Sequence, residues 1–261
     1  GLRVQRAVRW VLAMQSRNGG WAAFDKDNTS RLPARLPFAD FGEMIDPPSA
    51  DVTGHVVEML GALGYGRDHA PAAKGLRYLY GQQEKEGSWF GRWGVNHIYG
   101  LGAVLPALLA AGEPVDSLAV RRAVRWLIER QNPDGGWGET CASYVDVEAR
   151  GRGESAPSQT AWALLGLVAA GRGDSGAALR GALYLTERQQ SDGSWDEESF
   201  TGCGFPGYGI GEERGARIKE GRELAAGFMI RYHLYRNCFP LLALGRYRAA
   251  LRAPTLAADG E

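Results

Sequence analysis

Few side chains in this sequence combine the residue type and the spacing that acid–base chemistry requires. Asp25 and Asp27 form a carboxylate pair, but they stand in a polar turn where we expect both to be solvated and ionised. An ionised carboxylate cannot donate a proton. His55 lies in an otherwise apolar segment. There it could serve as a general acid or base, or simply as a hydrogen-bonded core histidine.

Composition narrows the classes of function. The 30 basic and 30 acidic residues cancel, which argues against a nucleic-acid surface. The three cysteines, Cys141, Cys203 and Cys238, are widely spaced and fit a reducing compartment rather than a disulfide framework. No cluster of His, Cys and Asp has the spacing of metal ligands. The longest apolar run, around 101–111, contains Pro106 and is too short to cross a bilayer.

One phrase, Gln-x-x-x-Gly-x-Trp, occurs four times. An apolar pattern with helical spacing precedes each copy, and the glycine suits the left-handed turn that ends a helix. We expect the phrase to be structural, with the Gln hydrogen-bonded to free backbone groups at a neighbouring helix end and the Trp packed over it. An aromatic residue stands five positions before each Gln. The copies are 15–21, 83–89, 131–137 and 189–195, and the aromatics are Trp10, Tyr78, Trp126 and Tyr184.

A more hydrophobic segment follows each phrase, and it predicts a second helix. Ser158 is the expected N-cap of the third of these helices. The repeating unit is therefore an outer, arginine-bearing helix, a turn and an inner helix. Four units predict an all-α fold, an α/α barrel or toroid with the second helices lining its centre. The second helices are expected within 51–66, 96–113, 157–173 and 229–248.

Four stretches give the chain a specific family resemblance. They are "LPFADFGEMIDPPSADVTGHV", "GSWFGRWGVNHIYG", "GCGFPG" and "YHLYRNCFPLLALGRY". With the Gln…Trp phrases, they resemble the C-terminal part of squalene–hopene cyclases, the bacterial class II triterpene cyclases. The resemblance covers almost the whole chain. It implies that residues 1–252 supply four of about six helix pairs of a C-terminal barrel domain, with an insertion at 208–227 and a tail at 253–261.

The resemblance also implies a reaction. Family members are isomerases, that is intramolecular transferases, which cyclise squalene to pentacyclic hopene or hopanol through a proton-initiated carbocation cascade. Their acid lies in an Asp-x-Asp-Asp motif. The nearest match here, 25–28, ends in Asn, and the resemblance places the motif upstream of Gly1. We therefore expect this chain to supply cavity and acid-tuning residues without the acid itself, and to be inactive in isolation.

Site residues follow from the same resemblance. His55 matches the histidine that hydrogen-bonds the acid, and Tyr99 matches the tyrosine that helps to reprotonate it through water. Aromatic faces attract a carbocation by about 0.5–2 kcal/mol each without trapping it. The matching cavity positions are Phe24, Phe41, Trp93, Phe205, Phe228, Tyr232 and Tyr235, with Ile230 as an aliphatic shape-setting residue and Phe38 and Ala39 at the channel constriction.

Partners follow as well. The resemblance implies no metal and no cofactor, because a Brønsted acid starts the reaction. The expected partners are squalene or a similar linear polyprene and the N-terminal half of the cyclase. Contact with the cytoplasmic face of the bacterial membrane would be peripheral and monotopic, without a transmembrane segment. A homodimer is compatible with these expectations. Apolar faces left open by absent neighbours would make the isolated chain poorly soluble or oligomeric.

Two other interpretations compete with the cyclase. The β subunit of a protein prenyltransferase shares the barrel but needs a zinc site built from Asp, Cys and His. Its Asp-x-Cys pair is absent, since Cys141 lies in "ETC" and Cys203 in "TGC". The second alternative is a non-catalytic helical-repeat module or a decayed cyclase remnant. An adjacent reading frame carrying Asp-x-Asp-Asp would favour a split or fragmentary cyclase over that alternative.

Overall fold

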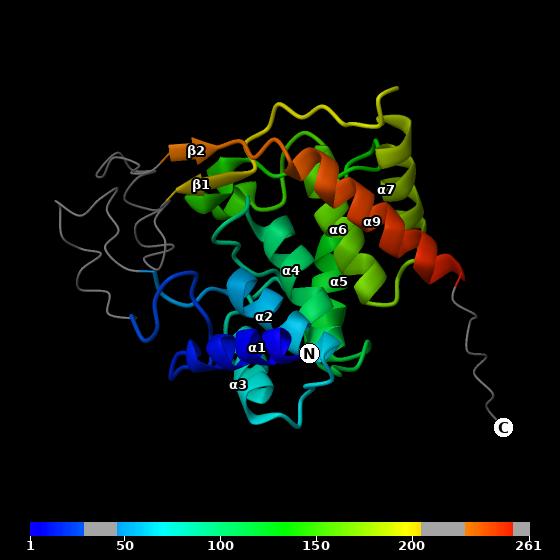
Figure 1. Ribbon diagram of the computed structural model, residues 1–261. Helices are drawn as coiled ribbons and strands as arrows, with labels where there is room; N and C mark the ends of the chain where they lie inside the picture. The colour runs from blue at the N-terminus through cyan, green and yellow to red at the C-terminus, as the bar shows by residue number, and fades with distance from the viewer. Residues whose placement is uncertain (29–45, 205–227, 253–261) are drawn as a thin grey trace.

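The computed structural model describes residues 1–28, 46–204 and 228–252, and these form an all-α fold of paired helices (Figure 1). The all-α prediction is confirmed. Two short 3-10 helices, η3 (Cys141–Tyr144) and η4 (Val147–Ala149), lie within the third unit, between its outer and inner helices. The outer helices are α1 (Leu2–Ala13), α3 (Ala70–Gly81), α5 (Leu118–Glu129) and α7 (Gly176–Glu187). The inner helices are α2 (Ala50–Ala62), α4 (His97–Ala110), α6 (Pro157–Ala169) and α9 (Tyr235–Arg252).

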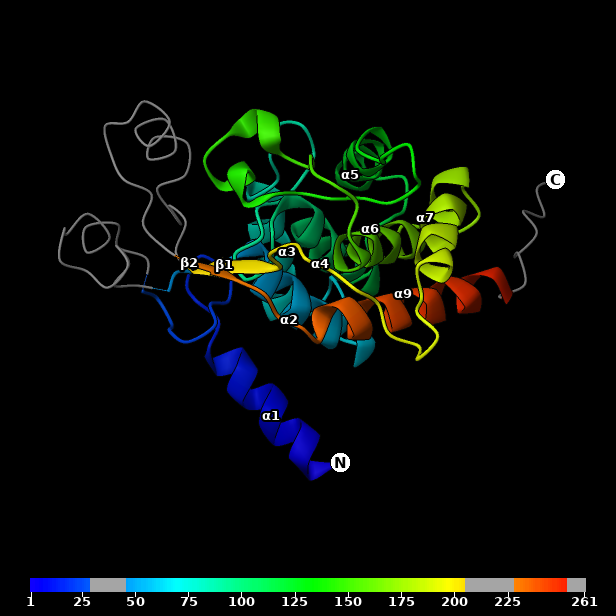
Figure 2. The same cartoon turned by 90° about the horizontal axis from the view of Figure 1, so that it is seen from above.

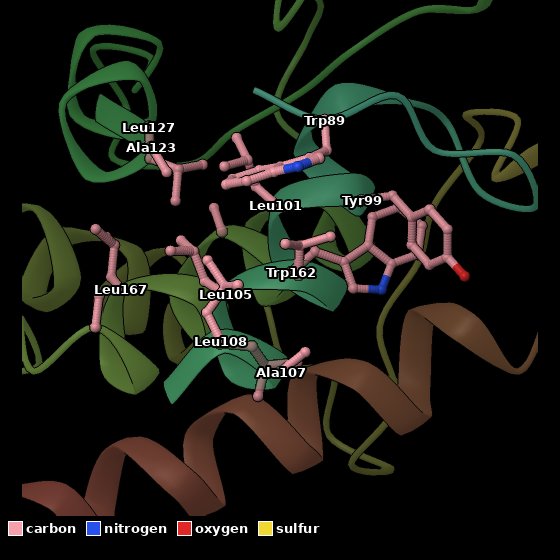
Figure 3. Packing of buried hydrophobic residues seen from close by; sticks show 14 of the residues in the cluster. Trp89, Tyr99, Leu101, Leu105, Ala107, Leu108, Ala123, Leu127, Trp162 and Leu167 are labelled. Atoms are coloured by element: carbon pink, nitrogen blue, oxygen red, sulfur yellow. The ribbon is translucent and has the colours of Figure 1, made fainter. Parts of the chain in front are cut away.

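The inner helices pack in chain order, α2 against α4, α4 against α6, and α6 against α9. Nearly every residue of α4 and α6 is buried, as expected of helices that are apolar all round. Residues 161–167 are buried in α6, so the predicted inside position is confirmed for α4 and α6, whereas in α9 only Pro240 and Ala243 are buried. Figure 3 shows Leu101 and Leu105 of α4 packed with Leu127 and Leu167 in this core.

Each of the first three Gln…Trp phrases forms hydrogen bonds in two directions, within its own unit and to the next outer helix. The Gln83 side-chain amide donates to the Gly87 carbonyl of its own turn and, at 2.9 Å, to the Ala119 carbonyl in the first turn of α5. The Trp89 ring N–H donates at 2.7 Å to the Leu79 carbonyl of the helix just ended. The predicted structural role of the phrase is confirmed, although the groups that the Gln reaches on the neighbouring helix are carbonyls near its start.

The fourth inner helix begins later than the sequence pattern predicts. Residues 229–248 were expected to be one helix, but Phe228–Ile230 forms strand β2, antiparallel to β1 (Gly202–Gly204), and α9 starts only at Tyr235. The Ile230 carbonyl accepts from the Thr201 N–H at 2.9 Å. Pairing with a distant segment therefore overrides the local helical spacing, because it satisfies backbone groups that the strand would otherwise leave without partners.

The predicted N-cap of the third inner helix is also wrong. Pro157 is the first residue of α6, a position that proline suits, and Ala156 is the cap. Ser158 lies one residue inside the helix. Its N–H and its hydroxyl donate to the two carboxylate oxygens of Glu197, at 2.8 and 2.7 Å. The Glu197 carboxylate, which belongs to the fourth unit, therefore accepts hydrogen bonds at the start of α6, where Ser158 was expected to do so.

Removal of one buried indole should cost much of the fold's stability. We expect Trp137→Ala to lower the free energy of unfolding by about 3–5 kcal/mol, because the ring is fully buried and its N–H is bonded to the Leu127 carbonyl. Urea unfolding followed by circular dichroism measures the loss. Trp10→Ala is the control: this ring is 64% exposed, so the change should stay within about 0.5 kcal/mol. Equal losses would contradict the packing described.

Two of the predicted segments fall outside the described residues. The insertion at 208–227 and the tail at 253–261 are not described, so the domain boundaries stay predictions. In the described part of the chain, no helix has both the length and the apolar character needed to cross a bilayer.

Candidate functional site

The two predicted acid–base residues lie together on adjacent inner helices. His55, on α2, is exposed, and its Nε2 atom is 3.4 Å from the hydroxyl oxygen of Tyr99 on α4. A glycine permits this approach of the helices, since a Cβ atom at Gly54 would be 2.9 Å from the Ala103 carbonyl oxygen. The sequence places His55 next to Gly54, so close helix packing positions the imidazole at Tyr99.

Tyr99 is a neutral hydroxyl at physiological pH. The side chain is 6% exposed, and burial raises the pKa of its phenol well above the ordinary value, with the nearby Asp51 charge adding to the shift. The group can pass a proton along a hydrogen-bonded chain but is far too weak an acid to start a reaction. Tyr99 therefore cannot be the initiating acid.

A row of aromatic rings continues from Tyr99. Its ring centroid is 4.9 Å from that of Trp162 on α6, which is 5.9 Å from Tyr235 at the start of α9. Tyr235 is in turn 4.9 Å from Tyr232. Figure 3 shows Tyr99 beside Trp162. Tyr232 is 38% exposed. The row therefore runs from a buried end to an open one.

Sequence reasoning missed Trp162, which joins the predicted Tyr99 to the predicted Tyr235. One signal was available. Trp162 is the single aromatic residue in the inner helix 157–169, whose other residues apart from Gln159 are small or aliphatic. An aromatic ring in that setting stands out as a candidate for a specific contact, although its burial alone would equally suit the core.

A second pair of rings lies beside the first helix pair. Phe24 and Trp93 meet edge to face, with centroids 5.7 Å apart, and the Arg92 guanidinium stands 4.8 Å from the Trp93 ring centroid. The backbone N–H of Trp93 donates to the Asp51 carboxylate at 2.8 Å. Because Asp51 lies one helical turn before His55 on α2, this bond holds the Trp93 loop near the imidazole.

The remaining predicted site residues are only partly described. Ile230 is half-buried in β2, and for Phe228 only the strand backbone is described. Phe38, Ala39, Phe41 and Phe205 lie outside the described residues. Their roles, like those of the other site residues, stay predictions.

Asp25 and Asp27 sit in the turn after the first phrase, as expected. The Asp27 carboxylate accepts from the Arg17 N–H at 2.6 Å, and this bond, with the nearby Arg17 charge, lowers the pKa of the carboxyl. Asp25 is exposed and accepts from the Asn28 amide at 3.0 Å. Asp27 is ionised at neutral pH and cannot serve as the initiating acid. Among the described residues no group of three or more His, Cys, Asp or Glu side chains could hold a metal ion.

Buried carboxylates hold the starts of two inner helices, and sequence reasoning missed both. Glu139 is 3% exposed and accepts at 2.9 Å from the Ile98 N–H in the first turn of α4, next to the helix that carries His55. Glu197 does the same for α6. Each stands two residues after the Trp of a phrase, and that regular position was the available signal. Negative charge at a helix N-terminus is favourable.

Burial raises the pKa of Glu139 above its ordinary 4.5, and this makes stability depend on pH. As pH rises, the Glu139 carboxyl loses its proton in the unfolded chain at a lower pH than it does in the folded chain. Folding therefore becomes less favourable as pH rises above 4.5. Glu139→Gln does not titrate. We expect the stability of the natural protein relative to this variant to be greatest below pH 4.5 and to fall as pH rises. Urea midpoints of both proteins from pH 4 to 7 measure the trend, with the exposed Glu129→Gln as the matched control. A relative stability that rises with pH would contradict it.

The fold is the one found in solved terpene cyclases. Among solved structures, the type II terpene cyclase MstE from Scytonema covers 95% of this chain with a TM-score of 0.63 at 20% identity, and the match spans 69% of that chain. The ent-copalyl diphosphate synthase of Streptomyces platensis covers 91% at a TM-score of 0.54 and 18% identity, over 37% of its own length. These likenesses show the fold.

Sequence comparison gives the family. The squalene–hopene cyclase C-terminal domain family matches residues 2–212, and the chain belongs to this family. It is 49% identical over 94% of its length to the squalene–hopene cyclase of Alicyclobacillus acidocaldarius and 43% identical over 95% to that of Zymomonas mobilis. It is 41% identical over 96% to the dammaradiene synthase of Dryopteris crassirhizoma. The chain spans 36%, 35% and 37% of these relatives, so it corresponds to the C-terminal part of a cyclase.

Proposed function

We propose that the chain is the C-terminal part of an enzyme that cyclises squalene, or a similar linear polyprene, to a pentacyclic hopanoid. The observation that carries the proposal is the continuous arrangement of His55, Tyr99, Trp162 and Tyr235 on three neighbouring inner helices and the start of the fourth. It combines a proton-handling pair with a row of π-faces.

The proton-handling pair stands at the initiation end. A terminal alkene is a very weak base, so its protonation requires a carboxylic acid strengthened by its neighbours. In this proposal His55 donates a hydrogen bond to that acid, which lies in the part of the enzyme outside this chain. Such a bond stabilises the carboxylate left after proton transfer, and therefore makes the acid stronger. Tyr99, 3.4 Å from the imidazole, relays a proton from water to restore the acid.

The aromatic row stabilises the carbocation as it moves. Each ring face contributes about 0.5–2 kcal/mol of cation–π attraction. Burial raises the pKa of both Tyr99 and Tyr235, so their phenols stay neutral. A phenolate would attack the cation and end the cascade early, whereas a neutral phenol presents a π-face without a strong nucleophile. Contact with the membrane, the source of a hydrocarbon substrate, is peripheral and lies at the cytoplasmic face in this proposal.

A graft tests the function. In the graft, this chain replaces the matching segment of the Alicyclobacillus cyclase. We expect the graft to convert squalene to hopene and its hydrated alcohol, identified by gas chromatography, and we expect EDTA to leave the rate unchanged, since proton transfer needs no metal. A folded graft that gives no product would favour the decayed-remnant interpretation. Loss of activity on EDTA treatment, restored by added metal, would contradict the proton-initiated mechanism.

A further inference from the structure

The loop before α4 lies directly against the ring of Tyr99. A Cβ atom at Gly94 would be 2.5 Å from the Tyr99 Cγ atom, and one at Gly91 would be 2.7 Å from its Cδ1 atom. Only glycine lets a main chain come this close to a ring, and both glycines are buried. The backbone of the 90–96 loop therefore sets the place of the ring, and with it the 3.4 Å approach of the phenol hydroxyl to His55.

The side chain of Tyr144 in η3 holds this loop. Its hydroxyl donates at 3.0 Å to the Gly94 carbonyl and lies 3.5 Å from the Gly91 carbonyl. The Tyr144 side chain is 7% exposed, and its ring meets that of Phe90 edge to face, with centroids 5.6 Å apart. One buried hydroxyl therefore contacts both of the glycines whose backbone lies against the Tyr99 ring.

The segment that carries this tyrosine has no counterpart in the second unit. Residues 138–156 join the third phrase to α6, whereas residues 90–96 join the second phrase to α4, and the longer connection forms η3 and η4. Figure 2 shows these two helices, in bright green, standing away from α5 and α6 toward the side of β1 and β2. The Arg150 guanidinium, just after η4, forms ion pairs with Glu86 at 3.0 Å and Glu84 at 3.4 Å in the second phrase. The segment is therefore fixed to the unit whose loop it contacts.

A different residue holds the middle of the loop. The backbone N–H groups of Arg92 and Trp93 donate to the Asp51 carboxylate of α2, at 3.1 and 2.8 Å. These bonds involve neither glycine carbonyl. Loss of the Tyr144 hydroxyl should therefore release the two glycines while the middle of the loop stays attached to α2.

We propose that Tyr144 is a positioning residue for Tyr99. Through the carbonyls of Gly91 and Gly94, its hydroxyl keeps the loop against the Tyr99 ring, and so keeps the phenol hydroxyl within reach of His55. It acts through the loop and not on the reacting atoms. The inference rests on the proposed function, which gives Tyr99 its relay role.

Amide hydrogen exchange of the graft tests the contact without an activity measurement. Tyr144→Phe removes the hydroxyl and keeps the ring, and we expect the peptide that spans residues 90–96 to exchange several-fold faster. Tyr184→Phe is the matched control, because it removes another buried hydroxyl, which donates at 2.8 Å to the Ser155 carbonyl on an outer helix. It should leave the loop unchanged. Unchanged exchange of the loop in Tyr144→Phe, or equal acceleration by the control, would overturn the inference.

Kinetics separate positioning of the relay from a general defect of the enzyme. In the proposed function the relay restores the acid only after product has formed, so the first turnover does not need it. In the graft, Tyr144→Phe should lower the steady-state kcat about tenfold, because a small displacement of a reacting group is costly. The single-turnover rate, measured with enzyme in excess of squalene, should stay within about twofold. Tyr184→Phe should alter neither rate, and equal losses of both rates in Tyr144→Phe would overturn the inference.

A double variant adds a second readout that a structural defect would not give. Tyr144→Phe should cause no further loss of kcat in a Tyr99→Phe graft, because the hydroxyl that it positions is already absent. A further loss of about tenfold there would overturn the inference. Faster exchange of the 90–96 loop in a Tyr144→Phe graft would support the contact even where the unmodified graft makes no hopene, a result that rejects the proposed function. An active graft in which Tyr99→Phe lowers kcat and Tyr144→Phe does not would overturn the inference and leave the proposed function standing.

Discussion

Replacing His55 with alanine in the graft is expected to lower the rate of squalene cyclisation by about 10²–10⁴-fold, the range typical of a general acid–base group. The imidazole is exposed on α2 and within 3.4 Å of Tyr99, where it can reach a carboxylic acid docked from outside the chain. In the proposed function, its removal leaves that acid without the hydrogen bond that strengthens it. Because the side chain is exposed, the variant should remain folded, and its unfolding midpoint should match that of the unmodified graft.

Asp25→Asn is the matched control for this experiment. Asp25 is an exposed carboxylate hydrogen-bonded to Asn28, and it plays no part in the proposed proton transfer. We expect its rate to stay close to that of the unmodified graft. The assay is the initial rate of hopene formation at saturating squalene. A harmless His55→Ala paired with an inactivating Asp25→Asn would show that the acid has been assigned to the wrong part of the molecule.

Much of the fold could be predicted because its determinants are local. The apolar spacing, the left-handed glycine and the repeated Gln and Trp all act within a few residues, and they predict a helix before each turn, where α3, α5 and α7 are found. The exceptions depend on distant partners. Strand β2 forms because residues 228–230 pair with 202–204, and Glu197 rather than Ser158 serves the start of α6. Helical spacing carries no information about such pairings.

The candidate site residues were predicted from a different kind of information than the fold. His55, Tyr99, Tyr232 and Tyr235 came from the family resemblance, because their residue types alone suit an ordinary core. The structure brings Tyr99 beside His55, and Tyr235 beside Tyr232. It adds Trp162, whose contact with Tyr99 depends on the packing of α4 against α6. Such a contact between two helices far apart in sequence could not be derived from either helix alone.

The isolated chain is expected to form no hopene, however well it folds. An imidazolium ion, with an ordinary pKa of about 6.5, is far too weak an acid to protonate an alkene. Tyr99 is weaker still, because burial raises the pKa of its phenol. Asp27 is held ionised by the Arg17 N–H. In the proposed function, the described residues therefore provide tuning and relay groups, and another part of the enzyme donates the proton.

Product analysis of the isolated chain and of the graft, side by side with squalene, tests this account most directly. Equal molar amounts are incubated, extracted and analysed by gas chromatography for hopene and its hydrated alcohol. We predict product from the graft and none above the no-protein background from the isolated chain. Hopene from the isolated chain would contradict the account, since it would mean that these 261 residues contain the initiating acid.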